Sequence, residues 1–293
     1  MRALPLLFLI AAWTPLPAAA APTYLGSFGY GGNGPDAMVD PVGMDIAPDG
    51  TVWIATAGLD KAKHFTMTGA YLGETYPEIP TPTGVTVLST GEIVVCSAAS
   101  VFRYPPDGTG RTNLGITGAY ALEANPAGGF WATQRTGATS RLLSWPDLGY
   151  SMLDGGAAGF VRMADGTCYV ANATLNRIDV FGGPGPAFSF GSTGSGPGQF
   201  SSPADVVIWN GHVLVADSGN HRIQSFGLDG AFRGQFGTAG TGPGQLLKPS
   251  GLAVALDGTL LVAELSNNRI SRFGDIATPA TASSWGRIKS LFR

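Results

Sequence analysis

The stretch Phe190–Pro203 reads FGSTGSGPGQFSSP, and the chain repeats it. Forty-six residues further on, Phe236–Pro249 reads FGTAGTGPGQLLKP, and near the start Phe28–Pro41 reads FGYGGNGPDAMVDP. The three copies share their length, an opening Phe-Gly, a central Gly-Pro and a closing proline. Self-similarity at such a period indicates an architecture built from repeated structural units.

The segment after each closing proline repeats as well. It contains two short apolar runs with a turn between them, as in ADVVIWNGHVLVADSG after Pro203. Six such pairs occur, and each turn has a glycine where a hairpin needs a positive φ: Gly50, Gly91, Gly128, Gly166, Gly211 and Gly258. A third run, which typically ends in an aromatic residue, and a shorter fourth run follow. Units of about 40 residues with four strands predict the blades of a β-propeller.

The sixth unit lacks its fourth strand, because the sequence after Phe273 reads GDIATPATASS. The missing pattern stands at the other end of the chain, where Tyr24–Phe28 reads YLGSF. Pairing of this segment with the last unit would remove an exposed sheet edge. We therefore predict an all-β, six-bladed β-propeller over residues 22–274, closed by the N-terminal strand.

The best-formed unit, VLVADSGNHRIQSF from Val213 to Phe226, resembles the NHL repeat, which is named after Asn-His-Leu. Asn220, His221 and Arg222 stand at the name positions. The resemblance covers Tyr24–Gly274, strongly from Arg177 onward and weakly before it. It implies a six-bladed propeller but no single activity, since function depends on sites added to a fold.

The repeat motif places an acidic residue at the end of the second strand and an arginine at the start of the third. The turn between them can bring carboxylate and guanidinium together, and in the fourth unit an asparagine replaces the acid. We interpret the motif as a structural clamp, with ligand contact as the alternative. Its residues are Asp217, Asn220, Arg222, Asn172, Arg177, Glu264 and Arg269.

The innermost strand of each blade lines the channel of a propeller. Alignment of these strands puts Asp45, Thr86 and Glu123 at one position in the first three units, where the others have Val161, Val207 and Ala253. Asp205 lies two residues earlier in its strand. The architecture is similar to six-bladed lactonases, which hold calcium at the axis through Glu, Asn and Asp. This likeness implies Asp45 and Glu123 as calcium ligands; solvated polar groups at the channel mouth are the alternative.

The residues do not indicate a zinc site, a phosphate-binding loop, a nucleic-acid surface or a disulfide. His64, His212 and His221 fall at different structural positions and do not form a zinc set. The Gly-rich loops lack Gly-Lys-Ser/Thr and lead into strands, so they do not match a phosphate-binding loop. Residues 22–274 hold 13 Lys and Arg against 19 Asp and Glu, which disfavours nucleic acid. Cys96 and Cys168 belong to non-adjacent units, and we expect two free structural thiols.

The chain begins like a secretory signal peptide. Residues 1–21 contain Arg2, an apolar run and an alanine-rich cleavage region, so we expect a secreted or periplasmic protein. No other stretch approaches transmembrane length. Residues 275–293 form a linker and a short basic amphipathic tail, in which Trp285, Ile288 and Leu291 or Phe292 have helical spacing. This tail could contact a membrane, a sorting machine or the underside of the propeller.

These observations favour an exported, non-catalytic scaffold that binds an envelope or extracellular protein, peptide or glycan through its loop face. The Gly-rich loops 29–40, 191–202 and 237–248 should lie together on that face. We expect a monomer without nucleic-acid partners or an obligatory cofactor. The alternative is a calcium-dependent, lactonase-like hydrolase with its site in the central channel.

Overall fold

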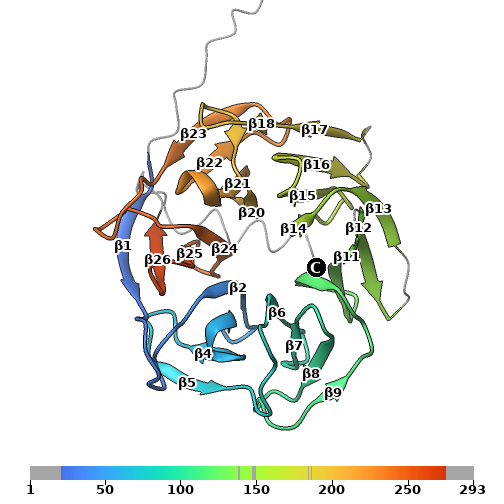
Figure 1. Cartoon of the computed structure of the whole chain (residues 1–293), viewed down its shortest axis with the longest axis vertical. Coiled ribbons are helices and arrows are strands. Elements are labelled where there is room, and N and C mark those ends of the chain that lie inside the picture. Colours follow the sequence, from blue (N-terminus) through green and yellow to red (C-terminus); the bar gives the residue numbers. More distant parts are fainter. Residues whose placement is uncertain (1–20, 138, 147–149, 184, 186, 275–293) are drawn as a thin grey trace, which may run out of the picture.

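The structure is a computed structural model that describes residues 21–137, 139–146, 150–183, 185 and 187–274. Six four-stranded antiparallel sheets stand around a central axis (Figure 1). This arrangement confirms the predicted six-bladed β-propeller. Residues 1–20 and 275–293 lie outside the described residues, and so do the expected signal peptide and tail.

The first three blades follow one another in chain order. Blade one consists of β2 (Pro41–Ile46), β3 (Val52–Thr56), β4 (Lys61–Phe65) and β5 (Tyr71–Glu74), with the short helix η1 (Ala57–Leu59). Blade two consists of β6 (Gly84–Val87), β7 (Ile93–Cys96), β8 (Val101–Tyr104) and β9 (Thr112–Asn113). Blade three consists of β10 (Ala119–Ala124), β11 (Phe130–Thr136), β12 (Thr139–Trp145) and β13 (Tyr150–Asp154).

The remaining blades contain the well-formed repeats. Blade four consists of β14 (Ala157–Arg162), β15 (Cys168–Asn172), β16 (Arg177–Phe181) and β17 (Phe188–Phe190). Blade five consists of β20 (Pro203–Trp209), β21 (His212–Asp217), β22 (Arg222–Phe226) and β23 (Phe232–Phe236), with the short helix η2 (Ser218–Asn220). Blade six consists of β24 (Pro249–Val254), β25 (Leu260–Glu264), β26 (Arg269–Gly274) and β1 (Thr23–Phe28). The two-residue strands β18 (Ser192–Thr193) and β19 (Gln199–Phe200) pair within a Gly-rich loop.

The N-terminal strand closes the ring as the sequence predicts. β1 pairs antiparallel with β26, with Tyr24 opposite Phe273 and Phe28 opposite Ile270. The rings of Tyr24 and Phe273 meet edge to face at 5.7 Å. The first and last parts of the chain therefore share one blade, and the sixth sheet gains its fourth strand.

The core lies between blades rather than within any one of them. The second strands β3, β7, β15 and β25 are buried along their whole length because each faces a neighbouring blade on both sides. One cluster joins blades one and six through Ile54, Phe65, Leu261 and Ile270. No blade can bury its apolar faces alone, so the ring forms as a unit.

Two expectations about single residue types hold. All six hairpin glycines have positive φ, between 75° at Gly211 and 104° at Gly128. Cys96 and Cys168 are free and buried, and burial raises the pKa of each thiol to about 12.

No helix among the described residues is long and apolar enough to span a membrane.

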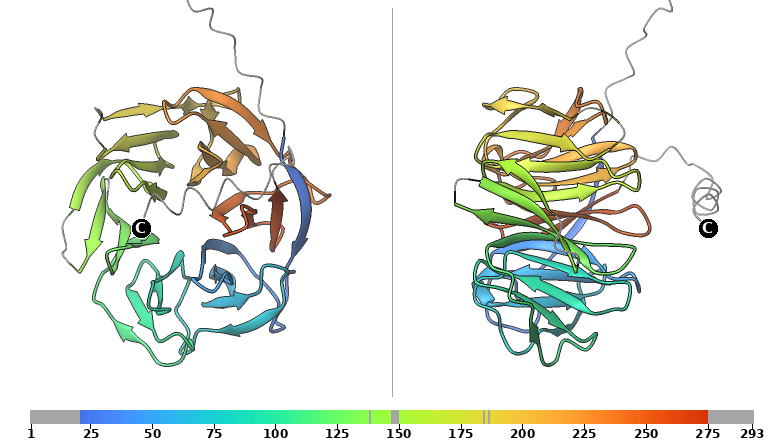
Figure 2. Two further views of the ribbon diagram at one scale, coloured as in Figure 1. Left: turned by 180° about the vertical axis from the view of Figure 1, so that it is seen from behind. Right: turned by 90° about the vertical axis from the view of Figure 1, so that its right-hand side faces the viewer.

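The disc has two distinct faces, seen edge-on in the right panel of Figure 2. We call the side where each innermost strand begins the loop face; it carries the loops 29–40, 191–202 and 237–248. We call the opposite side the hairpin face, since the turns between first and second strands lie there. The antiparallel strand order puts Gly274, at the end of β26, on the hairpin face beside the turn 255–259, where Leu260 pairs with Phe273.

Candidate functional site

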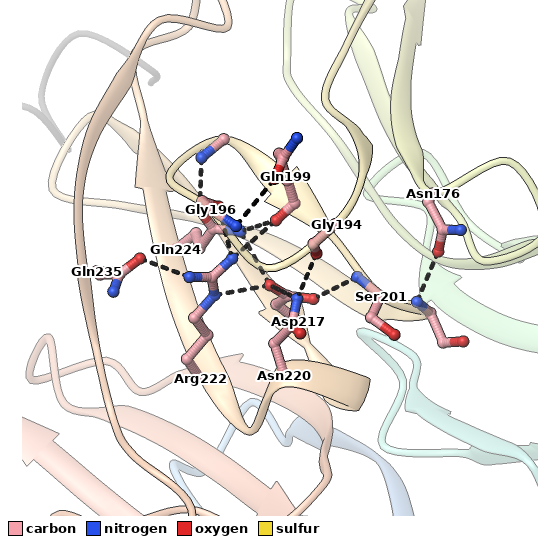
Figure 3. A network of polar contacts seen from close by, with 12 residues as sticks. Asn176, Gly194, Gly196, Gln199, Ser201, Asp217, Asn220, Arg222, Gln224 and Gln235 are labelled. Atoms are coloured by element: carbon pink, nitrogen blue, oxygen red, sulfur yellow. Dashed lines mark hydrogen bonds and ion pairs between the residues drawn. The ribbon is translucent and has the colours of Figure 1, made fainter.

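The repeat motif of blade five forms a buried polar network on the loop face (Figure 3). Asp217 is fully buried, and its Oδ2 accepts from Arg222 Nε at 2.8 Å and from Asn220 Nδ2 at 2.9 Å. Gln224 Nε2 donates to the same oxygen at 3.0 Å, and Ser201 N–H donates to Oδ1 at 2.8 Å. Every polar atom of this carboxylate is thus engaged within the protein.

The same network fixes the Gly-rich loop that leads into blade five. Arg222 Nη2 donates to the carbonyl oxygens of Gly196 and Gln199 at 2.8 and 2.9 Å. Asn220 Nδ2 donates to Gly194 O at 2.9 Å (Figure 3). The motif side chains therefore hold the backbone of this loop through its carbonyl groups, which gives the clamp interpretation a physical basis.

Blades six and one hold their Gly-rich loops in related ways. Arg269 Nε lies 2.7 Å from the buried Glu264, and Arg269 Nη1 donates to Thr241 O at 2.7 Å. In blade one Lys63 holds the loop. It lies two residues further along the third strand than the motif arginine does in blades five and six, and its Nζ donates to Gly34 O and Pro35 O at 3.1 and 2.9 Å. Blade one thus keeps the clamp although its motif is degenerate.

Blade four departs from the expected pair. Asn172 stands opposite Arg177 in the strand register, but Arg177 Nε pairs with Asp179 Oδ1 at 2.7 Å. Asn172 Nδ2 donates to Asp179 Oδ2 at 2.9 Å, so the carboxylate comes from the third strand. Sequence reasoning missed Asp179, although an acid two residues after the motif arginine was a visible signal.

A second set of contacts, which the sequence analysis did not identify, links neighbouring blades. In blades one, four, five and six, the residue just before the third strand has positive φ, and its side chain accepts a hydrogen bond from a backbone N–H that precedes the next innermost strand. The acceptor–donor pairs are Asp60–Thr81 (2.7 Å), Asn176–Ser202 (2.7 Å), His221–Lys248 (3.1 Å) and Asn268–Asp40 (3.0 Å). We call these contacts the inter-blade latches.

The central channel is a cavity of about 630 Å³. Its wall is formed by the six innermost strands and is mostly apolar, with three carboxyl side chains from alternate blades: Asp45, Glu123 and Asp205. Tyr120 lines its loop-face end, and the Arg135 guanidinium lies 3.7 Å from the centre of that ring. The structure therefore places the sequence-predicted acids in one cavity.

Each channel acid accepts a hydrogen bond from the innermost strand of the next blade. Asp45 Oδ2 accepts from Thr86 Oγ1 at 2.6 Å and from Val87 N–H at 2.9 Å. Glu123 Oε2 accepts from Arg162 N–H at 2.9 Å, and Asp205 Oδ2 accepts from Leu252 N–H at 2.8 Å. The three acids thus join blade one to two, three to four and five to six.

Burial disfavours charge on these acids. It raises the pKa of Glu123 to about 8; the hydrogen bond from Arg162 N–H opposes this shift, and the charges of Asp45 and Asp205 add to it. Burial raises the pKa of Asp205 to about 7 against two backbone hydrogen bonds, and it raises the pKa of Asp45 as well. A carboxyl with such a pKa can hold a proton near neutral pH, as a general acid must.

The calcium assignment at Asp45 and Glu123 stays a prediction. Both Asp45 oxygens already accept hydrogen bonds, since Ile46 N–H donates to Oδ1 at 2.7 Å. Glu123 accepts a hydrogen bond from Arg162 N–H at Oε2. Within residues 21–274 as described, no three His, Cys, Asp or Glu side chains are grouped as a metal site. These residues fit a calcium ion poorly in the arrangement seen here.

The three histidines lie apart, as their spacing suggested. His64 Nε2 lies 2.6 Å from Thr51 Oγ1 and its ring stacks on Trp53. His221 takes part in an inter-blade latch, and His212 lines a separate cavity of about 200 Å³ at blade five. Each therefore has a local role in a different place.

Six four-stranded blades around one channel define the class of protein as a six-bladed β-propeller. Residues 200–226, which include η2 and most of the polar network, match the NHL repeat. A curated relative, "Protein brain tumor" of Drosophila melanogaster, is 42% identical over 79 residues, which are 26% of this chain and 8% of that protein. The chain thus carries an NHL repeat in a propeller, and it resembles only a small part of that relative.

Solved structures with this fold differ in what they do. An auxiliary nutrient binding protein from Bacteroides ovatus has a TM-score of 0.68 at 12% identity, over 87% of this chain and 77% of that one. A gluconolactonase from Xanthomonas campestris has a TM-score of 0.63 at 13% identity, over 82% and 87% of the two chains. At such identities the likeness shows the fold alone.

Proposed function

We propose that the protein is an exported, non-catalytic binding propeller that takes a protein, peptide or glycan on its loop face. The observation that carries this proposal is the clamping of the Gly-rich loops by Lys63, Arg222 and Arg269. Loops fixed before a ligand arrives lose little conformational entropy on binding, which favours recognition. The nutrient binding protein of the same fold is consistent with such a role.

The loop face exposes aromatic rings beside hydrogen-bonding groups, which can bind a polar ligand that also has flat apolar surfaces. Tyr30, in the loop 29–40, is 48% exposed, and its hydroxyl donates to Asp36 Oδ1 at 2.7 Å. Tyr120 and Arg135 stack at the loop-face mouth of the channel. Rigid aromatic groups beside hydrogen-bonding groups are common in binding surfaces for peptides and sugars.

The test is a screen of the full chain against glycan and peptide arrays, followed by affinity measurement for each hit. Tyr30→Ala should weaken binding at least tenfold without changing thermal stability. Tyr76→Ala is the matched control, because Tyr76 is 69% exposed but lies at the outer edge, where it bridges to Thr109. Equal affinities for the two variants would refute a loop-face site.

The second candidate is a hydrolase with its site in the channel. The raised pKa of Glu123, at the wall of a cavity of about 630 Å³, is the observation that favours it. Metal analysis of purified protein, together with lactone and ester substrates, tests this candidate. Turnover that is lost in Glu123→Gln would support a hydrolase with Glu123 as its acid, and stoichiometric calcium lost in the same variant would show that the ion binds there despite the poor fit. Absence of turnover, with no thermal shift by calcium, would reject it.

A further inference from the structure

The hairpin-face mouth of the channel is an apolar opening without a partner in the described structure. Leu256, in the turn of blade six, lines this mouth and is 69% exposed. Pro48 and Pro126, from the equivalent turns of blades one and three, line the same opening. An exposed apolar rim around a deep cavity is typical of a surface that another segment covers.

The charge at this mouth is negative. This charge comes from exposed carboxylates in the turns; Asp45 and Glu123, which lie one residue before the hairpin end of their strands, are buried acids on which charge is disfavoured. Asp49, Asp165 and Asp257 stand exposed in the surrounding turns, and each is held by the N–H of the residue two positions on. A segment that covers the mouth should therefore combine apolar with basic side chains.

The chain itself carries such a segment. Ser284–Arg293 reads SWGRIKSLFR, with Trp285, Ile288 and Leu291 at helical spacing and with three basic residues, Arg287, Lys289 and Arg293. We propose that this segment docks on the hairpin face and covers the channel mouth around Leu256. The proposal concerns the opposite side of the disc from the proposed ligand surface and does not depend on it.

The tether allows this docking. Gly274, the last described residue, lies on the hairpin face beside the turn that carries Leu256, because Phe273 pairs with Leu260. Residues 275–283 can extend over roughly 30 Å. The third strand lies two strand spacings, about 10 Å, outside the innermost strand that lines the channel. Docking of a tethered segment is intramolecular, so modest contacts suffice to populate it.

Disulfide trapping in the full chain tests the proposal. Leu256→Cys with Ile288→Cys should form an intramolecular disulfide under mild oxidation, detected by mass and by non-reducing electrophoresis. The control pairs Leu25→Cys with Ile288→Cys, since Leu25 is 44% exposed and lies beside Gly274, within easy reach of an undocked tail. We expect the first pair to react at least about tenfold faster than the second. The native thiols of Cys96 and Cys168 are buried and leave the result unaffected.

A second variant separates docking from chance encounter. Replacement of Arg287, Lys289 and Arg293 by Gln leaves the propeller untouched and should slow trapping at Leu256→Cys while the Leu25→Cys control is unchanged. Equal trapping rates for the two positions would overturn the proposal. In that case, binding of the wild-type tail to anionic vesicles or to a sorting component would be the remaining role for this segment.

Discussion

Asp40 N–H donates to Asn268 Oδ1 at 3.0 Å, across 228 residues of sequence and across the seam of the ring. Asn268 has a φ of 52° and Asp40 a φ of 50°, so both ends of the contact lie in left-handed conformations. The same geometry links blade five to six through His221 and Lys248. Closure of the ring therefore uses the same latch as an ordinary junction between consecutive blades.

Loss of the seam latch should weaken the whole ring. Asn268→Ala removes the acceptor and places a β-carbon in a left-handed position without a local hydrogen bond. We expect the free energy of unfolding to fall by about 1–3 kcal/mol, measured by urea denaturation.

The chain supplies the control for this prediction. Asn268→Asp should keep most of the stability, because Asp60 performs the same task in blade one. Likewise, His221→Asn should be tolerated better than His221→Ala, since Asn176 occupies the equivalent place in blade four. If Asn268→Ala and Asn268→Asp unfold at the same urea concentration, the latch contributes nothing.

The buried ion pair of blade five should be far more sensitive to substitution than the partly exposed pair of blade four. Arg222→Ala leaves the fully buried Asp217 without its main partner and should cost about 3–5 kcal/mol. Arg177, whose side chain is 34% exposed, pairs with Asp179, and Arg177→Ala should cost at most about 1 kcal/mol. Thermal unfolding of the two variants compares them directly; similar losses would contradict the role assigned to burial.

The channel acids should make the protein less stable as the pH rises. The pKa of Glu123 is about 8 in the folded state against an ordinary value of 4.5, so the folded protein keeps a proton that the unfolded chain has lost. The free energy of unfolding therefore falls as pH rises from about 4.5 to about 8.

Glu123→Gln should reduce this slope, because the amide does not ionise, and should stabilise the protein by roughly 1–3 kcal/mol above pH 8. Chemical denaturation at pH 5, 7 and 9 measures the effect. Part of the slope should remain, since burial also raises the pKa of Asp205. An unchanged slope in the variant would show that Glu123 is ionised in both states.

Close approach of the innermost strands near the loop face should make Gly159 irreplaceable. A β-carbon there would lie 1.8 Å from Asp205 Oδ1 and 2.7 Å from Asp205 Cα. Gly159→Ala should therefore cost on the order of 3 kcal/mol or prevent folding. Gly73→Ala is the control, because nothing lies within 4 Å of a β-carbon at that strand position. Expression level and melting temperature of the two variants provide the measurement.

Much of the fold could be read from local patterns. The hairpin glycines marked turns, and the aromatic residue that typically ends each third strand marked the blade period, as at Phe226. The Tyr24–Phe28 pattern identified the closing strand because it matched a piece missing from the last unit. These inferences succeeded because turn geometry and strand alternation depend on neighbouring residues.

The candidate site was only partly predictable. Alignment of the innermost strands brought Asp45 and Glu123 into one channel, as the structure has them. The choice of hydrogen-bond partners was not predictable: Arg177 pairs with Asp179 rather than across the turn, and Asp45 binds Thr86 of the next blade. Such choices depend on rotamers and on side chains from other units.

Local signals along the chain specify a closed ring of six repeated units, because each unit carries its own turn and strand residues and cannot bury its apolar faces alone. The roles of the polar residues, in contrast, are set by the folded ring. The distance between Asp40 and Asn268, the burial of Asp217 and the raised pKa of Glu123 arise between blades, where desolvation and contact are set by parts of the chain far apart in sequence.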